Sequence, residues 1–285
     1  MNDTQYIICD ICPRRCHISE CETGFCGARG LDINPSTGEK NLISLNYGKI
    51  ASISLDPIEK KPLRRFHPGK MILSVGSFGC NLTCPWCQNY RISRAKKDDL
   101  VTQDVSPEKL SELAMEQVYA GNIGVAFTYN EPLISYEYIC DVSRLLKTLG
   151  LKSVLVTNGF ASPETFSSIL PMVDAMNIDL KSIKENFYQK IGGDVNVVKK
   201  NIKAAAAVCH IELTCLLINE ENDNEEEMQE MTDFIASISE DTPLHISRFF
   251  PQYEMKDKEP TRIESMERFK RIAEKKLKYV YLGNI

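Results

Sequence analysis

The chain has 285 residues, of which 43% are apolar and 26% charged, a composition typical of globular proteins that excludes an intrinsically disordered chain. Its formal net charge of −5 argues against nucleic acid as a partner. No apolar run approaches the ~18–20 residues of a membrane helix, and the N-terminal residues do not resemble a secretory signal. We therefore expect a cytoplasmic protein that does not span a membrane.

The cysteines fall into two clusters. Five of the eleven lie within residues 9–26 and three within residues 80–87, whereas Cys140, Cys209 and Cys215 stand alone. In a reducing compartment, clustered cysteines bind metals or carry out redox chemistry more often than they form disulfides. The two clusters therefore predict two metal sites, and the three isolated cysteines are expected to be buried and structural.

Residues 1–69 have little helical periodicity. Two segments with alternating apolar residues, 42–50 and 51–58, flank a turn near Gly48 and predict a β-hairpin. Four cysteines of the first cluster, Cys9, Cys12, Cys16 and Cys26, have ligand-like spacing and favour zinc or a second iron–sulfur cluster. Cys21 either replaces Cys26 in that site or stays unliganded. We expect residues 1–69 to form a small Cys-rich, metal-binding module that includes the hairpin.

From residue 70 onward, strands alternate with helices. The predicted strands cover residues 71–78, 124–129, 153–158, 173–180, 210–218 and 244–250, with a last one near the C-terminus. The predicted helices begin near Ser106 and then cover 134–150, 163–170, parts of 184–207, 225–238 and 263–277. This alternation argues for an α/β fold with a parallel sheet. Six repeats fall short of an eight-fold barrel, which needs about 250 residues, so residues 70–285 predict a partial (β/α)6 TIM-like barrel.

The strongest motif is Cys80-x3-Cys84-x2-Cys87, directly after the first predicted barrel strand. Three thiolates at this spacing can bind three irons of a 4Fe–4S cluster and leave the fourth iron open. Structural zinc usually takes four protein ligands. The motif therefore favours a 4Fe–4S cluster with one iron free to bind a ligand.

This motif and its position resemble the radical S-adenosylmethionine (SAM) superfamily. The resemblance implies that Cys80, Cys84 and Cys87 hold the catalytic cluster, whose open iron binds the amino and carboxylate groups of SAM. It also implies an oxidoreductase-type reaction: reductive cleavage of SAM to a 5′-deoxyadenosyl radical, which abstracts a hydrogen atom from a substrate. An electron donor such as flavodoxin or ferredoxin would be a partner.

Three further motifs follow in the order of that superfamily. Residues 128–132, TYNEP, stand where the family's Gly-Gly-Glu motif binds the cofactor's amino group, with both glycines replaced. Residues 157–159, TNG, and 179–181, DLK, match the branch that contains the pyruvate formate-lyase activating enzymes. The resemblance implies these cofactor-binding residues: Trp86, Asn130, Glu131, Thr157, Asn158, Asp179 and Lys181. Taken alone, TNG also fits a turn, DLK a charged strand exit and Trp86 a core aromatic.

A closer resemblance extends over nearly the whole chain and points to the radical enzyme of the AmmeMemoRadiSam system. It rests on the N-terminal cysteines with residues 24–29, and on residues 56–63, 87–89, 245–249 and 279–284. The substrate remains open between a protein and a small molecule. Two alternatives stand beside it: an activase that installs a glycyl radical on a partner protein, and a non-enzymatic metal-binding adaptor.

Each of two remaining features has two possible interpretations. His245 either contacts substrate from the barrel lumen or is a hydrogen-bonded core residue. Residues 60–97 carry nine Lys or Arg and no Asp or Glu, which predicts either a solvated surface or contact with an anion. Arg64 and Arg65 belong to this basic stretch.

Overall fold

A computed structural model describes residues 6–285. An eight-stranded sheet forms its centre, in the order β14-β13-β12-β11-β10-β9-β7-β6. All pairs from β7 to β14 are parallel, and β6 is antiparallel to β7. The strands are β6 (Ser52–Pro57), β7 (Met71–Gly76), β9 (Asn122–Phe127), β10 (Lys152–Thr157), β11 (Ala175–Asp179), β12 (His210–Leu217), β13 (Leu244–Arg248) and β14 (Val280–Gly283). Since β6 and β14 form its two edges, the predicted partial barrel with a parallel sheet is confirmed.

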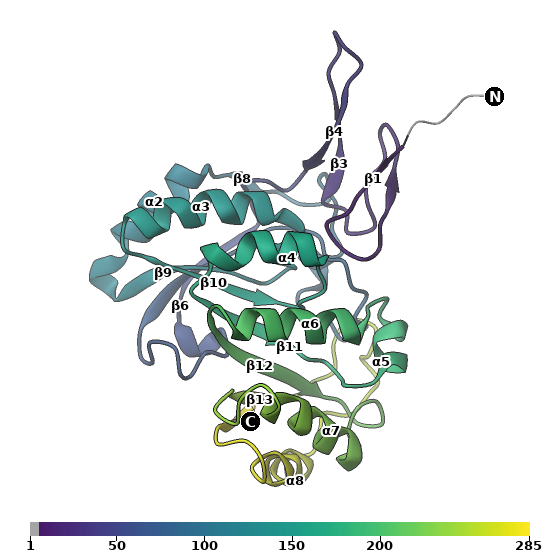
Figure 1. Ribbon diagram of the computed structural model, residues 1–285, viewed down its shortest axis with the longest axis vertical. Helices are drawn as coiled ribbons and strands as arrows, with labels where there is room; N and C mark the ends of the chain where they lie inside the picture. Colours follow the sequence, from purple (N-terminus) through teal and green to yellow (C-terminus); the bar gives the residue numbers. More distant parts are fainter. Residues whose placement is uncertain (1–5) are drawn as a thin grey trace, which may run out of the picture.

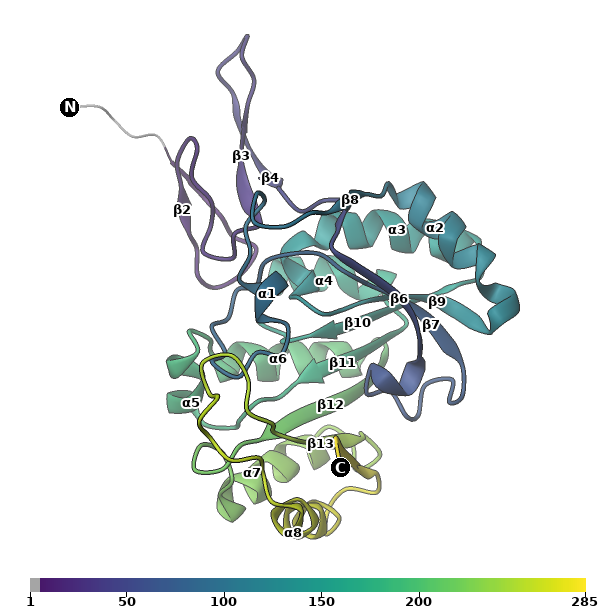
Figure 2. The same ribbon diagram turned by 180° about the vertical axis from the view of Figure 1, so that it is seen from behind.

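The helices cover one face of this sheet. Figure 1 shows α3, α4 and α6 in front of the strands, and in Figure 2 the strands lie in front of these helices. The larger helices are α2 (Pro107–Glu116), α3 (Tyr136–Thr148), α4 (Pro163–Ile169), α5 (Glu185–Lys190), α6 (Val195–Ala206), α7 (Glu225–Ala236) and α8 (Ile263–Ala273). Between residues 6 and 285, no helix is long and apolar enough to cross a membrane.

Side-chain caps set where several helices begin. The Ser106 side chain accepts a hydrogen bond from the Lys109 amide at 3.2 Å, and Pro107 follows at the first helical position. Ser162 caps α4 in the same way, with Pro163 after it. Such caps satisfy amide donors that have no partner inside the helix. The start of α2 predicted near Ser106 is therefore confirmed.

The predicted hairpin between residues 42–50 and 51–58 is wrong. β4 (Lys40–Ser44) pairs with β3 (Arg29–Ile33), and the short β5 (Lys49–Ile50) pairs with β8 (Gln103–Asp104). The second arm becomes β6 and pairs with β7. Alternation specifies which face of a strand is apolar but not its partner, and β7 offered an edge whose main-chain groups needed partners.

Residues 7–44 project from one end of the barrel (Figure 1) and include β1 (Ile7–Ile8), β2 (His17–Ile18) and the β3–β4 pair. The domain division at residues 69 and 70 stays a prediction. Within it, β6 belongs by its hydrogen bonds to the main sheet.

Residues 58–65, which follow β6, fill part of the lumen of the barrel. Ile58 and Leu63 are fully buried against a small cluster of inward residues from four strands, Ile72, Ala126, Val154 and Ala175. The buried carboxylate of Glu212 accepts hydrogen bonds from the amides of Arg64 and Arg65, at 3.0 and 2.6 Å. These contacts hold residues 58–65 against the inner face of the sheet.

His245 also contacts Glu212, at 2.6 Å, and is buried. Of its two interpretations, the hydrogen-bonded core histidine is therefore confirmed. Burial alone would raise the pKa of Glu212, but hydrogen bonds from His210, His245 and the Arg65 and Arg64 amides outweigh it and lower the pKa to about 2. Glu212 is thus an ionised anchor of the lumen at neutral pH.

We expect Glu212→Gln to destabilise the protein near neutral pH. The N–H₂ group of glutamine would face the Arg64 and Arg65 amides, whose hydrogen bonds the carboxylate now accepts. A carboxylate with a lowered pKa stabilises the fold above its unfolded pKa, and this contribution disappears as the pH falls through its folded pKa. The difference in unfolding free energy from wild type should be on the order of 3 kcal/mol at pH 6 and should shrink toward pH 3. Urea unfolding at both pH values measures it. The exposed Glu116→Gln is the control, and a pH-independent difference would contradict the assignment.

Candidate functional site

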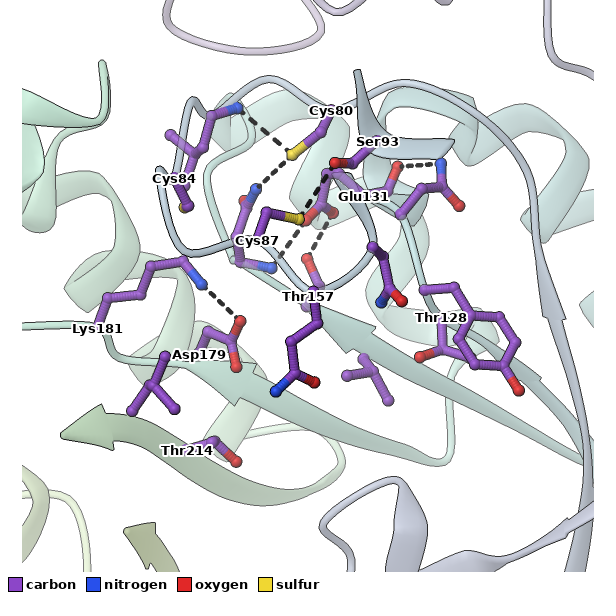
Figure 3. Close-up of a pocket in the computed structure, with 18 of the residues that line it drawn as sticks. Cys80, Cys84, Cys87, Ser93, Thr128, Glu131, Thr157, Asp179, Lys181 and Thr214 are labelled. Atoms are coloured by element: carbon purple, nitrogen blue, oxygen red, sulfur yellow. Dashed lines mark hydrogen bonds and ion pairs between the residues drawn. The ribbon is translucent and has the colours of Figure 1, made fainter. Parts of the chain in front are cut away.

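The carboxyl ends of the parallel strands converge on a cavity of about 370 Å³. Parallel α/β sheets place their binding sites at this edge. In Figure 3 the three cysteines lie in a loop above the sheet, and Asp179, Lys181 and Thr214 lie along the strands below it. All predicted pocket residues line this one cavity: Cys80, Cys84, Trp86, Cys87, Asn130, Glu131, Thr157, Asn158, Asp179 and Lys181.

The loop that carries the cysteines follows β7 and is held by hydrogen bonds to its main chain. Arg94 donates to the carbonyl oxygens of Cys80 and Leu82, at 2.9 and 2.7 Å. The Cys80 sulfur accepts from the Leu82 amide at 3.5 Å, and the Cys87 sulfur lies 3.2 Å from the Ser93 hydroxyl. The loop is therefore fixed in position, and two of its three sulfurs take part in hydrogen bonds.

The thiols of Cys80 and Cys84 are poor anions without a bound cation. Burial raises the pKa of Cys80, and it raises the pKa of Cys84 to about 11. Bound metal ions stabilise thiolates in such surroundings. Among residues 6–285, no group of three or more Cys, His, Asp or Glu side chains is arranged to hold a single metal ion. A 4Fe–4S cluster does not need such a group, because each of its cysteines binds a different iron.

Asn130 fastens the turn after β9 to the start of the cysteine loop. Its side-chain oxygen accepts from the Ser77 amide at 2.9 Å, and its Nδ2 donates to the carbonyls of Phe78 and Gly79, both at 3.1 Å. In this structure Asn130 thus joins two strand ends. Its predicted contact with a cofactor stays a prediction.

Glu131 has a similar joining role and is buried. Its carboxylate accepts from the Leu133 amide at 3.0 Å, from the Thr157 hydroxyl at 2.6 Å and from the Asn158 amide at 2.8 Å. A carboxylate has about four acceptor sites, so Oε2 keeps one that could receive a ligand's ammonium group. Burial raises the pKa of Glu131 to about 7, and a cationic ligand would favour its ionised form.

Asn158 connects this carboxylate to the cysteine loop. Its Nδ2 lies 3.7 Å from the Cys80 sulfur and donates to the Asn81 side-chain oxygen at 2.9 Å. Asn81 in turn donates to the Phe160 carbonyl at 2.6 Å. The TNG motif therefore supplies both a turn and a donor beside the Cys80 sulfur.

Asp179 and Lys181 form an ion pair of 2.6 Å at the end of β11. Burial lowers the pKa of Lys181, but Asp179 and Cys84 outweigh burial and raise it, so Lys181 remains a cation. Trp86 is mostly buried, and its ring centroid lies 5.4 Å from that of Phe187. These side chains place a cation, a carboxylate and an aromatic face around one cavity.

The N-terminal cysteines gather at a second place. Cys9, Cys12, Cys16 and Cys26 line one small cavity beside Arg29 and Asn81. Cys21 is exposed and is not part of that lining. Burial raises the pKa of Cys26 to about 11. The four residues predicted as ligands are thus brought together, and Cys21 is not among them.

The sequence interpretation missed several residues of the main cavity. Lys60, Pro62, Tyr129, Thr214, Ser247 and Asn284 also line it. Thr214 and Ser247 share the inward face with His245 by strand alternation, which was the available signal. Arg64 and Arg65 do not reach this lining; Arg65 stacks on Tyr279 at 3.9 Å, and Arg64 lies 5.5 Å from the Tyr281 ring.

Residues 74–234 match the sequence profile of the radical SAM superfamily. The chain belongs to this superfamily. This radical SAM enzyme is 38% identical to an uncharacterized protein of Methanocaldococcus jannaschii, over 99% of this chain and 83% of that protein. Membership implies a 4Fe–4S cluster and SAM, and the three-cysteine lining of the main cavity fits both.

Two more distant likenesses concern the sequence in one case and the fold in the other. It is 24% identical to the pyruvate formate-lyase-activating enzyme of Clostridium pasteurianum, over 50% of this chain and 63% of that enzyme. A radical SAM methyltransferase structure from Sphaerobacter thermophilus shares its fold, with a TM-score of 0.56 and 13% identity over 89% of this chain and 72% of that one. The chain therefore has relatives among the activating enzymes, although it spans less than two thirds of the enzyme from Clostridium.

Glu131→Gln should destabilise the strand-end network, because the glutamine N–H₂ would oppose one of three donors. We expect its unfolding free energy to fall by about 1–3 kcal/mol, the cost of leaving a buried polar group unsatisfied. Urea unfolding of the variant beside Glu116→Gln, whose side chain is exposed, measures this. Equal stability of the two variants would show that the Glu131 carboxylate does not hold the strand ends together.

Proposed function

We propose that this chain is the radical SAM enzyme of an AmmeMemoRadiSam-type system, and that it abstracts a hydrogen atom from a substrate. The observation that carries the proposal is the meeting of Cys80, Cys84 and Cys87 in one cavity with the Asp179–Lys181 pair and Glu131. When bound, the cluster and SAM supply one-electron reductive cleavage to a 5′-deoxyadenosyl radical. An electron donor of the flavodoxin or ferredoxin type would provide the electron.

The chain's own residues would bind and orient the cofactor. The ammonium of Lys181 is suited to the SAM carboxylate, and the remaining acceptor site of Glu131 to the SAM ammonium. Asn130, Thr157 and Asn158 would hold these groups in place through the strand-end hydrogen bonds. Trp86 offers an apolar face for the adenine.

A glycyl-radical activase is the second candidate. It is favoured by the similarity to the pyruvate formate-lyase-activating enzyme, which covers half of this chain. The two candidates differ in substrate, which is a partner protein for an activase. Co-purification of a glycyl-radical enzyme with this chain would favour the activase. The non-enzymatic adaptor is disfavoured by membership in a superfamily of enzymes.

Anaerobically reconstituted protein should cleave SAM to 5′-deoxyadenosine when it is reduced with dithionite. SAM should also change the electron paramagnetic resonance signal of the reduced protein, because it binds the open iron. Changing Cys80, Cys84 and Cys87 together to alanine should abolish both responses. If this triple variant kept SAM cleavage, the proposed cluster site would be wrong.

We further propose that Cys9, Cys12, Cys16 and Cys26 bind zinc or an auxiliary iron–sulfur cluster, both of which take soft thiolate ligands. Metal binding can supply ~10 kcal/mol to small modules, and residues 6–33 contain little other buried apolar surface. Metal analysis of the triple variant isolates this site and should find zinc or iron. Adding Cys26→Ala should remove that metal, whereas Cys21→Ala, as matched control, should retain it. A triple variant without either metal would refute the site.

A further inference from the structure

The segment Asp56–Leu63, DPIEKKPL, has a buried ion pair that the proposed cofactor contacts do not use. Asp56 lies on β6, and Lys61 follows the short 3₁₀ helix of residues 58–60. Both side chains are buried, with 2.9 Å between Lys61 Nζ and Asp56 Oδ2. Burying a charged pair is costly unless its geometry serves further contacts.

The pair holds Tyr129. The Tyr129 hydroxyl donates to Asp56 Oδ2 at 3.0 Å, and Lys61 Nζ lies 4.6 Å from the centre of its ring. Burial would raise the pKa of Asp56, but Lys61, Tyr129 and Lys60 outweigh it and lower the pKa to about 2. The anchor of the hydroxyl is therefore a charged carboxylate at neutral pH.

Tyr129 has a backbone conformation that suits glycine. Its φ is +71°, and the Asn130 amide donates to the Thr128 carbonyl at 3.0 Å. This is a γ-turn with positive φ, the rare and strained form. Bulky residues adopt such conformations only when the surroundings enforce them. By the resemblance stated above, Tyr129 stands where the family motif has a glycine, the residue that adopts a positive φ at the lowest cost.

The packing around Tyr129 is built for this turn. A Cβ on Gly76 would lie 2.8 Å from the Tyr129 ring and 2.9 Å from the Thr128 carbonyl oxygen. Thr128, Tyr129 and Asn130 all line the main cavity. A change in the φ of Tyr129 would therefore shift residues that line this cavity.

We propose that the Asp56–Lys61 pair is a positioning device that holds Tyr129 in its left-handed turn and thereby shapes the SAM-binding main chain. Asp56, Lys61 and Tyr129 are positioning residues, and the DPIEKKPL segment compensates for the absent glycine. The inference rests on the proposed cofactor site.

Substitutions at Tyr129 distinguish backbone positioning from direct contact. Tyr129→Phe and Tyr129→Ala lose the hydroxyl anchor but keep a Cβ, so we expect SAM to bind about tenfold more weakly, the factor that one charge-assisted hydrogen bond provides. Tyr129→Gly adopts φ +71° without an anchor and should stay within about threefold of wild type. Calorimetric titration of reconstituted protein with SAM measures this order. If Tyr129→Gly bound no better than Tyr129→Ala, the proposal would be overturned.

A double-mutant cycle tests the role of Asp56. Asp56→Asn should weaken SAM binding about tenfold in the wild-type background and leave it nearly unchanged in the Tyr129→Gly background, because the glycine needs no anchor. An equal loss in both backgrounds would contradict the proposal. Asp174→Asn is the matched control, since it breaks the 2.8 Å pair with Lys152 at the other end of the strands, and it should not change SAM binding.

Iron content and thermal midpoint are recorded for every variant, and unchanged iron with altered SAM affinity is the expected signature. Lower iron content in step with the lost affinity would indicate general disruption and overturn a positioning role. If wild-type protein itself failed to bind SAM, the proposed cofactor site would be at fault rather than the action of Asp56 on Tyr129.

Discussion

The site depends on the buried carboxylate of Glu131, which connects the ends of neighbouring strands by hydrogen bonds. It collects one donor from its own turn and two from the end of β10. Through Asn158, the same network reaches the Cys80 sulfur and Asn81. A parallel sheet brings strand ends together, but it does not fix the loops that follow them. Here hydrogen bonds to one carboxylate do so, and any cluster held by the cysteine loop inherits its position from them.

The sequence was most informative where local pattern and chemistry agree. The strands and helices after residue 70 follow from alternation and caps. The spacing of Cys80, Cys84 and Cys87 predicts the cluster site, and the structure brings these three residues to one cavity. The pairing of β6 with β7 could not be predicted from the sequence pattern. It depends on which strand edge in the folded chain has unpaired N–H and C=O groups. Similarly, the structural use of Asn130 and Glu131 depends on contacts between strand ends that no single motif encodes.

The N-terminal cysteines are connected to the main site by packing as well as by sequence order. Gly79 has φ +89°, and a Cβ on it would lie 2.4 Å from the Cys26 carbonyl oxygen. Arg14 donates to the Asn81 carbonyl at 2.7 Å, and Asn81 lines the same small cavity as Cys12. The cysteine loop therefore lies between the N-terminal residues and the barrel. A metal at Cys9, Cys12, Cys16 and Cys26 would stiffen one wall of that loop.

Residues 58–65, in the lumen of the barrel, are also held firmly by hydrogen bonds. The Pro62 carbonyl accepts from Asn177 at 2.9 Å, and Glu212 holds the amides that follow. Lys60 and Pro62 line the same cavity as Tyr129. One continuous stretch thus lines this cavity and, through Asp56 and Lys61, contacts the turn at Tyr129. Because a shift of this stretch would move both together, the anchored side chain of Tyr129 couples its turn to the shape of the cavity beside it.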